Sequence, residues 1–178
     1  LNEFTQQEIE IDNNGKPTGI IREKALDYVF ENLPKPTIEE KINAVTEFIN
    51  ILHSLGITTV TDITQVEDLE VYNELHRLGK LNVRINSYLP FSEFPNLKLH
   101  SEYTKKINPD FYTINGFKAF WDGALGSETA LFSKNYNDKE HNGYRTEDVK
   151  NGKLKKLAEM ISADSKQMII HAIGDKAV

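Results

Sequence analysis

The strongest constraint on the fold is a regular alternation of short apolar strands with amphipathic helices from residue 57 onward. β-Branched or apolar runs have the length and composition of strands at 57–62, 82–89, 114–121 and 167–173. A helical pattern lies between each strand and the next, at 66–78, 97–107 and 147–163. Strands that are joined through helices form right-handed βαβ units and a parallel sheet. The chain is therefore predicted to be an α/β protein.

Two architectures fit this alternation, an open doubly wound sheet and a (β/α)8 barrel. No glycine-rich phosphate-binding fingerprint follows any predicted strand, which disfavours a nucleotide-binding doubly wound fold. Polar residues stand at the carboxyl ends of three strands, namely Asp62, Lys118 and His171. Because both architectures carry their sites at that edge, these positions predict a site without choosing the fold.

The residues before this alternation predict a small separate element. Strand, turn and helix signals indicate a β-hairpin and a following helix, at 7–12, 18–22 and 23–32. Thr37 and Glu40 then form a capping box that begins the next helix. We expect residues 1–36 to be an N-terminal hairpin and helix insertion, and residues 37–178 to be the main domain.

Composition narrows the classes of partner and metal ligand. The net charge is -6 and the pI about 5.4, with no basic patch, so we expect no nucleic-acid partner. The apolar runs are much shorter than the roughly 20 residues of a membrane span, and no signal-peptide pattern is present. We therefore expect a cytoplasmic protein without membrane contact. Because the chain has no cysteine, any metal must use histidine, carboxylate or a modified lysine.

Lys118 stands inside an apolar strand segment, with aromatic and alanine neighbours on both sides. Desolvation there lowers the pKa of a lysine and increases its neutral, nucleophilic fraction. A neutral amine can add carbon dioxide and become a carbamate, whose two oxygens can bridge two metal ions. The alternative is a lysine whose stem packs at the strand edge while its ammonium reaches solvent.

His171 ends an apolar run, and Gly174 and Asp175 follow closely. A strand of a barrel presents a metal ligand at its rim in this way. The alternatives are a hydrogen-bonded core histidine, and a turn in which Asp175 caps a helix. Asp122 and Gly123 likewise fit an ordinary turn. The residues alone leave these alternatives open.

Two segments, 116–130 and 170–178, resemble the signature segments of the amidohydrolase superfamily, in its YtcJ-like, amidohydrolase-3 branch. That branch includes N-substituted formamide deformylases. Supporting segments stand upstream in the same order, at 15–23, 52–62 and 79–84. The resemblance thus extends over nearly the whole chain.

The resemblance implies a (β/α)8 barrel with a metal centre at the carboxyl ends of its strands. It identifies Lys118 as the carboxylated lysine of the fourth strand and His171 as the fifth-strand histidine ligand. Counting 57–62 as the second strand gives the same assignment. The loop after the fourth strand would overhang the site, which makes Trp121 and Asp122 candidates for substrate binding. Glu128 stands where relatives often carry a basic residue, and its role is open.

Other parts of the family site are absent from the sequence. It has no first-strand His-x-His pair, and the sixth-strand histidine and eighth-strand aspartate, the general base, would lie beyond it. The resemblance therefore implies an internal fragment, roughly strands 2 to 5 of the barrel, with no general base and no activity of its own. For the parent it implies hydrolysis of a non-peptide C–N bond, in a small amide or formamide, by a metal-activated water. The implied cofactor is a divalent metal, expected to be zinc, with one or two ions in the parent and weak or no binding by the fragment.

Two further hypotheses belong to other classes. A regulatory or sensor protein could retain the amidohydrolase barrel without catalysis, and an unrelated open α/β binding domain could match the motifs by chance. In the second case the side chain of Lys118 would point away from His171. The open strand edges at 57–62 and 167–173 also predict a homo-oligomer.

Overall fold

The computed structural model describes residues 8–21 and 24–178, and the chain divides into two compact units, Leu1–Pro36 and Thr37–Val178. In the first unit, β1 (Ile9–Ile11) and β2 (Pro17–Ile21) form an antiparallel hairpin, and α1 (Lys24–Asn32) follows. Asp12 closes the turn because its Oδ1 accepts the N–H groups of Asn14 and Lys16. The predicted hairpin is confirmed. Residues 7, 22 and 23 of the predicted elements lie outside the described residues.

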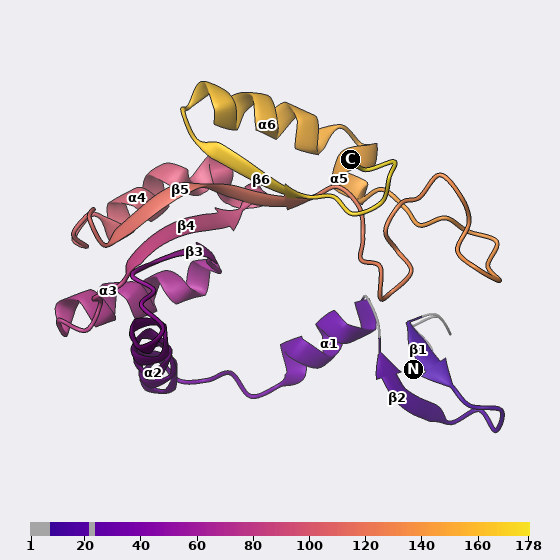
Figure 1. Cartoon of the computed structure of the whole chain (residues 1–178), viewed down its shortest axis with the longest axis horizontal. Coiled ribbons are helices and arrows are strands. Elements are labelled where there is room, and N and C mark those ends of the chain that lie inside the picture. Colours follow the sequence, from indigo (N-terminus) through magenta and orange to yellow (C-terminus); the bar gives the residue numbers. More distant parts are fainter. Residues whose placement is uncertain (1–7, 22–23) are drawn as a thin grey trace. The chain divides into compact units, whose positions relative to one another are not determined.

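The second unit is built on a parallel sheet in the order β3-β4-β5-β6. Its strands are β3 (Thr59–Ile63), β4 (Arg84–Pro90), β5 (Tyr112–Phe120) and β6 (Gln167–His171). Sequential strands are neighbours, and the sheet curls like half of a barrel wall (Figure 1). A doubly wound sheet would reverse its strand order at a switch point, whereas the order here runs in one direction. The predicted α/β fold with part of a (β/α)8 barrel is confirmed.

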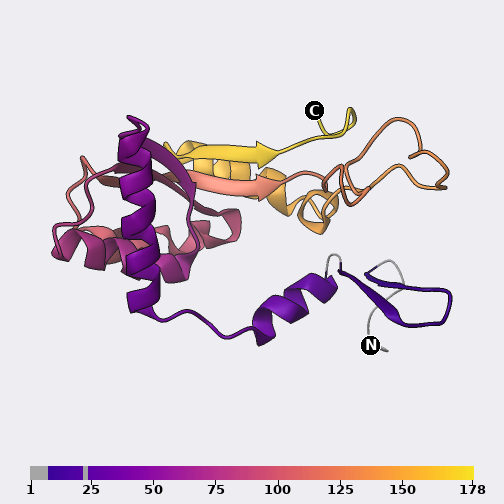
Figure 2. The same ribbon diagram turned by 60° about the horizontal axis from the view of Figure 1, so that its bottom comes forward.

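Helices cover one face of this sheet (Figure 1, Figure 2). They are α2 (Ile38–Ser54), α3 (Leu69–Arg77), α4 (Leu97–Thr104) and α6 (Lys153–Ala163), with the shorter η1 (Val66–Asp68), η2 (Phe91–Asn96) and α5 (Glu147–Lys150). Strand and helix side chains form one buried apolar cluster, in which Leu75, Leu89, Phe117 and Ile161 are fully buried. Each such side chain contributes roughly 1.5–3 kcal/mol by leaving water. Within the described ranges, no helix has both the length and the apolar character of a membrane span.

An irregularity in β5 decides which of its side chains face the helices. Ser87 of β4 pairs with Ile114, but the next pair skips one residue of β5, which leaves Asn115 as an extra residue in the ladder. Side chains alternate between the two faces of a strand. One extra residue therefore reverses which positions face the helices in the rest of the strand. Ile114 faces the helices before the irregularity and Phe117 faces them after it, both in the buried core. Lys118 therefore lies on the opposite face, which the helices leave uncovered.

The capping box that the sequence predicts is present, and one predicted helix is divided. The Thr37 side chain accepts the Glu40 N–H, and the Glu40 carboxylate accepts the Thr37 N–H. The pattern over 147–163 predicts a single helix, but the structure breaks it into α5 and α6. Gly152 lies between them with a left-handed backbone (φ 74°), which an α-helix does not contain.

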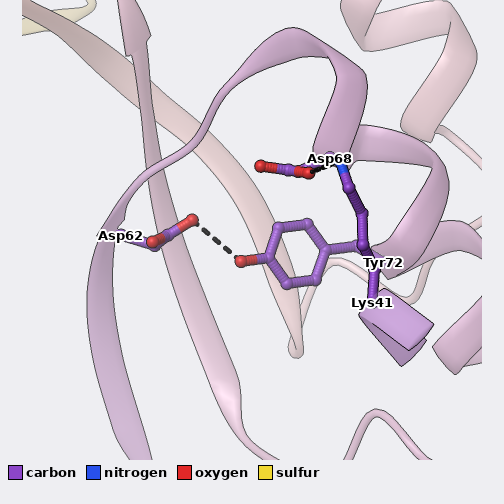
Figure 3. A network of polar contacts seen from close by, with 4 residues as sticks. All are labelled: Lys41, Asp62, Asp68 and Tyr72. Atoms are coloured by element: carbon purple, nitrogen blue, oxygen red, sulfur yellow. Dashed lines mark hydrogen bonds and ion pairs between the residues drawn. The ribbon is translucent and has the colours of Figure 1, made fainter. Parts of the chain in front are cut away.

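Asp62 lies on the helix side of the sheet, away from the uncovered face (Figure 3). Its Oδ2 accepts hydrogen bonds from the Tyr72 hydroxyl of α3 at 2.8 Å and from Thr64 Oγ1 at 2.5 Å. Beside it, Lys41 of α2 forms an ion pair with Asp68 at 2.6 Å. Although the sequence places Asp62 at a strand end like Lys118, its contacts fasten β3 to the helix layer.

The variant Tyr72→Phe keeps the buried ring but removes one hydrogen bond to the Asp62 carboxylate. We expect the free energy of unfolding at neutral pH to fall by about 1–3 kcal/mol, because a charged acceptor loses a donor. Burial, and then Asp62, raise the pKa of Tyr72 above its usual value. The tyrosine's contribution is therefore complete below the unfolded-state pKa of about 10 and declines as the pH rises above it.

Urea unfolding of both proteins between neutral and alkaline pH measures this difference. The control is Tyr103→Phe, which alters a half-exposed ring of α4. Equal effects of the two substitutions at neutral pH would show that the Asp62–Tyr72 contact does not stabilise the fold.

Candidate metal centre

Lys118 and His171 lie on the same face of adjacent strands. Lys118 of β5 pairs in register with Ile169 of β6, and Phe120 pairs with His171. Because residues two apart share a face, Lys118 and His171 are diagonal neighbours near the carboxyl ends of their strands. The Phe120 ring contacts both, with its centroid 4.5 Å from Lys118 Nζ and 5.3 Å from the centre of the His171 ring. The structure thus brings together the two residues that the sequence predicts as metal ligands.

The Lys118 amine is partly desolvated. Its side chain is partly buried, and this burial lowers the pKa of Lys118 below the usual lysine value. In the part of the chain that the structure describes, Nζ pairs with no carboxylate and rests against the face of Phe120. A lysine in such a place holds its proton less tightly, so a larger fraction is neutral and nucleophilic.

The His171 ring is oriented by the main chain that follows β5. Its Nε2 lies 3.0 Å from the carbonyl oxygen of Gly123, and its own carbonyl accepts the Trp121 N–H at 2.8 Å. Because a carbonyl oxygen can only accept, this contact requires the proton on Nε2 and leaves the lone pair of the neutral ring on Nδ1. Metal-bound histidines are commonly held by such a contact at their other nitrogen.

Asp122 is a buried carboxylate whose oxygens bind the main chain. It is 1% exposed. Its Oδ2 accepts the N–H groups of Leu131 and Gly174 at 2.8 and 2.9 Å, and its Oδ1 accepts that of Ile173 at 3.0 Å. Burial opposes ionisation, but the three N–H donors and the nearby His171 outweigh it and lower the pKa of Asp122 below its usual value. Asp122 thereby ties the loop after β5 to the segment after β6, a role that sequence reasoning missed.

A second set of contacts joins the same two segments. Asp175 accepts the N–H and the hydroxyl of Ser133, both at 2.6 Å. A Cβ on Gly174 would stand 1.8 Å from the Leu131 carbonyl oxygen, so only glycine fits at this close approach. The loop 122–145 extends beyond the carboxyl ends of β5 and β6 (Figure 2) and is fastened beside His171.

The residues predicted to bind substrate differ in their surroundings. Trp121 is partly buried, and its indole Nε1 has no hydrogen-bond acceptor among the described residues. The carboxylate of Asp122 is already engaged by main-chain donors. Glu128 has a left-handed backbone (φ 58°) and forms an ion pair with Lys139 at 3.7 Å. The assignment of Trp121 and Asp122 to substrate binding stays a prediction, and the role of Glu128 stays open.

The donors present fit part of a metal site. Among residues 8–21 and 24–178, no group of three or more His, Cys, Asp and Glu side chains could hold a metal ion. A catalytic zinc uses three protein ligands and a water. A carboxylated Lys118 would offer an anionic oxygen and His171 a neutral imidazole nitrogen, which are two donors of the kinds that zinc accepts.

A curled parallel sheet in sequential strand order, covered by helices on one face, defines part of a (β/α)8 barrel. The amidohydrolase family model matches residues 2–178. The chain therefore belongs to the amidohydrolase family, and the resemblance seen in its two signature segments is confirmed.

Three relatives align with nearly the whole chain. The "Putative amidohydrolase YtcJ" of Bacillus subtilis is 28% identical, over 93% of this chain and 32% of that protein. Protein LONG AFTER FAR-RED 3 of Arabidopsis thaliana is 27% identical, over 92% of this chain and 30% of that protein. Exoenzymes regulatory protein AepA of Pectobacterium carotovorum is 25% identical, over 94% and 37%. The chain thus spans 30% to 37% of the length of these relatives.

A solved structure has the same fold. The crystal structure of an uncharacterized metal-dependent hydrolase from Pyrococcus horikoshii OT3 matches with a TM-score of 0.73 and 28% identity. The match covers 94% of this chain and 34% of that one.

The variant Gly174→Ala tests the close approach between the two segments. We expect it to lower the free energy of unfolding by about 1–3 kcal/mol, because the methyl group collides with main chain that cannot rotate away. The matched control is Gly126→Ala in the same loop, where a Cβ meets nothing within 4 Å. Denaturant unfolding of both variants measures the difference, and equal values would contradict the packing described here.

Proposed function

We propose that the chain is a central part of a metal-dependent amidohydrolase that hydrolyses a non-peptide C–N bond in a small amide or formamide. The observation that carries this proposal is the placement of Lys118 and His171 on one uncovered face of adjacent strands, in a chain that belongs to the amidohydrolase family. The name of the Pyrococcus neighbour, a metal-dependent hydrolase, supports it.

Lys118 and His171 would hold a divalent metal, which we propose to be zinc. When bound, such an ion lowers the pKa of a water molecule and polarises a substrate carbonyl. The lowered pKa of Lys118 favours the neutral amine, which adds carbon dioxide, releases one proton and becomes a carbamate anion. The contact of His171 Nε2 with Gly123 leaves Nδ1 as the ligand atom. In a complete barrel the uncovered face lines the interior, where water is restricted.

The outer strand edges of the sheet affect the oligomeric state that we expect for the 178-residue chain by itself. Within the described residues, β3 and β6 each have one neighbouring strand, so their outer edges are unpaired. We propose that these edges pair with a second copy. The acidic composition without cysteine supports the cytoplasmic location that we propose for the parent.

Substitution of the two ligands in the full-length protein that contains this chain tests the function. We expect Lys118→Ala and His171→Ala to lower kcat/KM by more than about 100-fold, because each removes a direct metal ligand. Lys155→Ala, on the exposed side of α6, is the matched control and should retain turnover. Hydrolysis of a panel of N-acyl and N-formyl amines, with metal analysis of each protein, gives the measurement. Unchanged turnover in both ligand variants would remove the basis of the proposal.

The 178-residue chain alone should be inactive and should bind zinc weakly. It supplies two of the three protein ligands that a catalytic zinc uses, so we expect a Kd weaker than about 1 μM. Titration calorimetry, and metal analysis after dialysis against a chelator, measure this. Stoichiometric zinc that survives dialysis would contradict the assignment of only two ligands.

A second candidate is a regulatory protein that keeps the barrel for binding without turnover. The name of one relative, Exoenzymes regulatory protein AepA, favours this alternative. The full-length sequence separates the two, because an enzyme needs the His-x-His pair, the later histidine and the aspartate base.

A further inference from the structure

We propose that Asp122 is the positioning residue of the candidate metal centre, and that it holds His171 with its proton on Nε2 and its Nδ1 free before any metal binds. The inference rests on the proposed function in one respect, that His171 is a metal ligand. It adds a residue that acts on His171 through the main chain, because the Asp122 carboxylate accepts the N–H groups of Ile173 and Gly174.

The geometry begins with two short segments that run side by side beyond the sheet. Trp121 N–H donates to the His171 carbonyl at 2.8 Å, and the His171 Nε2–H donates to the Gly123 carbonyl at 3.0 Å. The N–H groups of Ile173 and Gly174 donate to Asp122 at 3.0 and 2.9 Å. Trp121, Asp122 and Gly123 therefore each contact the segment 171–174. In these contacts Trp121 and Gly123 use main-chain atoms, whereas Asp122 uses its side chain.

Asp122 is suited to control this arrangement because its carboxylate is charged and sealed from water. It is 1% exposed, so solvent does not compete for its oxygens. Hydrogen bonds from N–H groups to a carboxylate are roughly twice as strong as those to a neutral acceptor. Two of its three donors, Ile173 and Gly174, lie two and three residues beyond His171. The third donor, Leu131, belongs to the loop after β5, and its N–H donates to Asp122 Oδ2 at 2.8 Å.

The tautomer of His171 follows from the position of one carbonyl. Gly123 directly follows Asp122 in the chain, and its carbonyl accepts the hydrogen bond from the His171 ring. The Asp122 carboxylate therefore positions both this carbonyl and the main chain after His171. Loss of the carboxylate would leave buried N–H donors without an acceptor, which is costly. The two segments would then separate, and the Gly123 carbonyl would no longer select Nε2–H over Nδ1–H.

The chain offers a matched control in Asp175. This carboxylate joins the same loop to the same segment, but it does so through Ser133 and contacts neither His171 nor Gly123 in the described structure. A residue that merely stiffens the loop would act like Asp175. A positioning residue changes the ring of His171 specifically.

The experiment is 1H–15N NMR of the histidine rings in the 178-residue chain, at about pH 8.5 where imidazole is neutral. His171→Gln assigns the signal. For the unsubstituted protein we expect one tautomer, protonated at Nε2, with an Nε2–H that exchanges slowly with water. Asp122→Asn, of nearly the same shape, should speed this exchange by at least about tenfold and move both ring nitrogens toward the shifts of a mixture of tautomers. Asp175→Asn should leave the ring signals in place.

Three results would overturn the proposal: an unsubstituted protein with the proton on Nδ1, an unchanged ring in Asp122→Asn, or an equal change in Asp175→Asn. If Asp122→Asn does not fold, hydrogen exchange in the unsubstituted chain decides the question. The hydrogen bonds of the Ile173 and Gly174 amides and of the His171 ring should then open in one event, so that the three protons have the same protection factor against exchange. Different protection factors would overturn the proposal. None of these measurements uses metal or substrate, so they stand or fall separately from the hydrolase activity.

Discussion

Burial of one face of the curled sheet against its helices is the constraint on which the rest of the structure depends. Side chains alternate along each strand, so once Phe117 is committed to the core, Lys118 must lie on the other face. The extra residue at Asn115 makes this compatible with a buried Ile114 earlier in the same strand. Without that residue, either the core would lose an apolar side chain or Lys118 would point into the helix layer. The lysine's place is therefore a consequence of packing and register.

The same constraint explains why two acids beside strand ends have different roles. Asp62 lies on the helix face of β3, where Tyr72 and Thr64 satisfy it. Asp122 follows β5 immediately and turns its carboxylate toward the main chain of the loop and of the segment after β6. Both carboxylates accept hydrogen bonds from the chain itself, although both stand at the edge of the sheet where parallel α/β proteins carry their sites.

The sequence predicted the parts of this structure that depend on local pattern. The strand spacing, the N-terminal hairpin and the capping box at Thr37 and Glu40 follow from periodicity and from turn and cap chemistry. The division of the last helix was missed, because a glycine inside a helical pattern is ambiguous until its backbone is known, and Gly152 is left-handed. The face of Asp62 and the register skip at Asn115 could not be predicted, since they depend on pairing between strands. The role of Asp122 was hidden for a similar reason, because two of its donors lie more than fifty residues away in the sequence.

The two candidate ligands differ in how the chain fixes them, and this difference bears on how a metal centre would be completed. His171 is held at its carbonyl and at its Nε2 by Trp121 and Gly123, so its ring has a defined orientation from this chain alone. The Lys118 amine rests on an aromatic face, with no carboxylate partner among the described residues. A cation–π contact on a partly exposed ring is worth only about 0.5–1 kcal/mol, too little to hold a long side chain in one place. As metal ligands, His171 would therefore be a preorganised donor, and Lys118 would be one that requires a chemical change and a further partner to become fixed. The fold would then place the histidine first, and carboxylation and metal binding would place the lysine afterwards. The carbamate anion, which is costly to bury unpaired, would therefore form only when the metal cation is present to neutralise it.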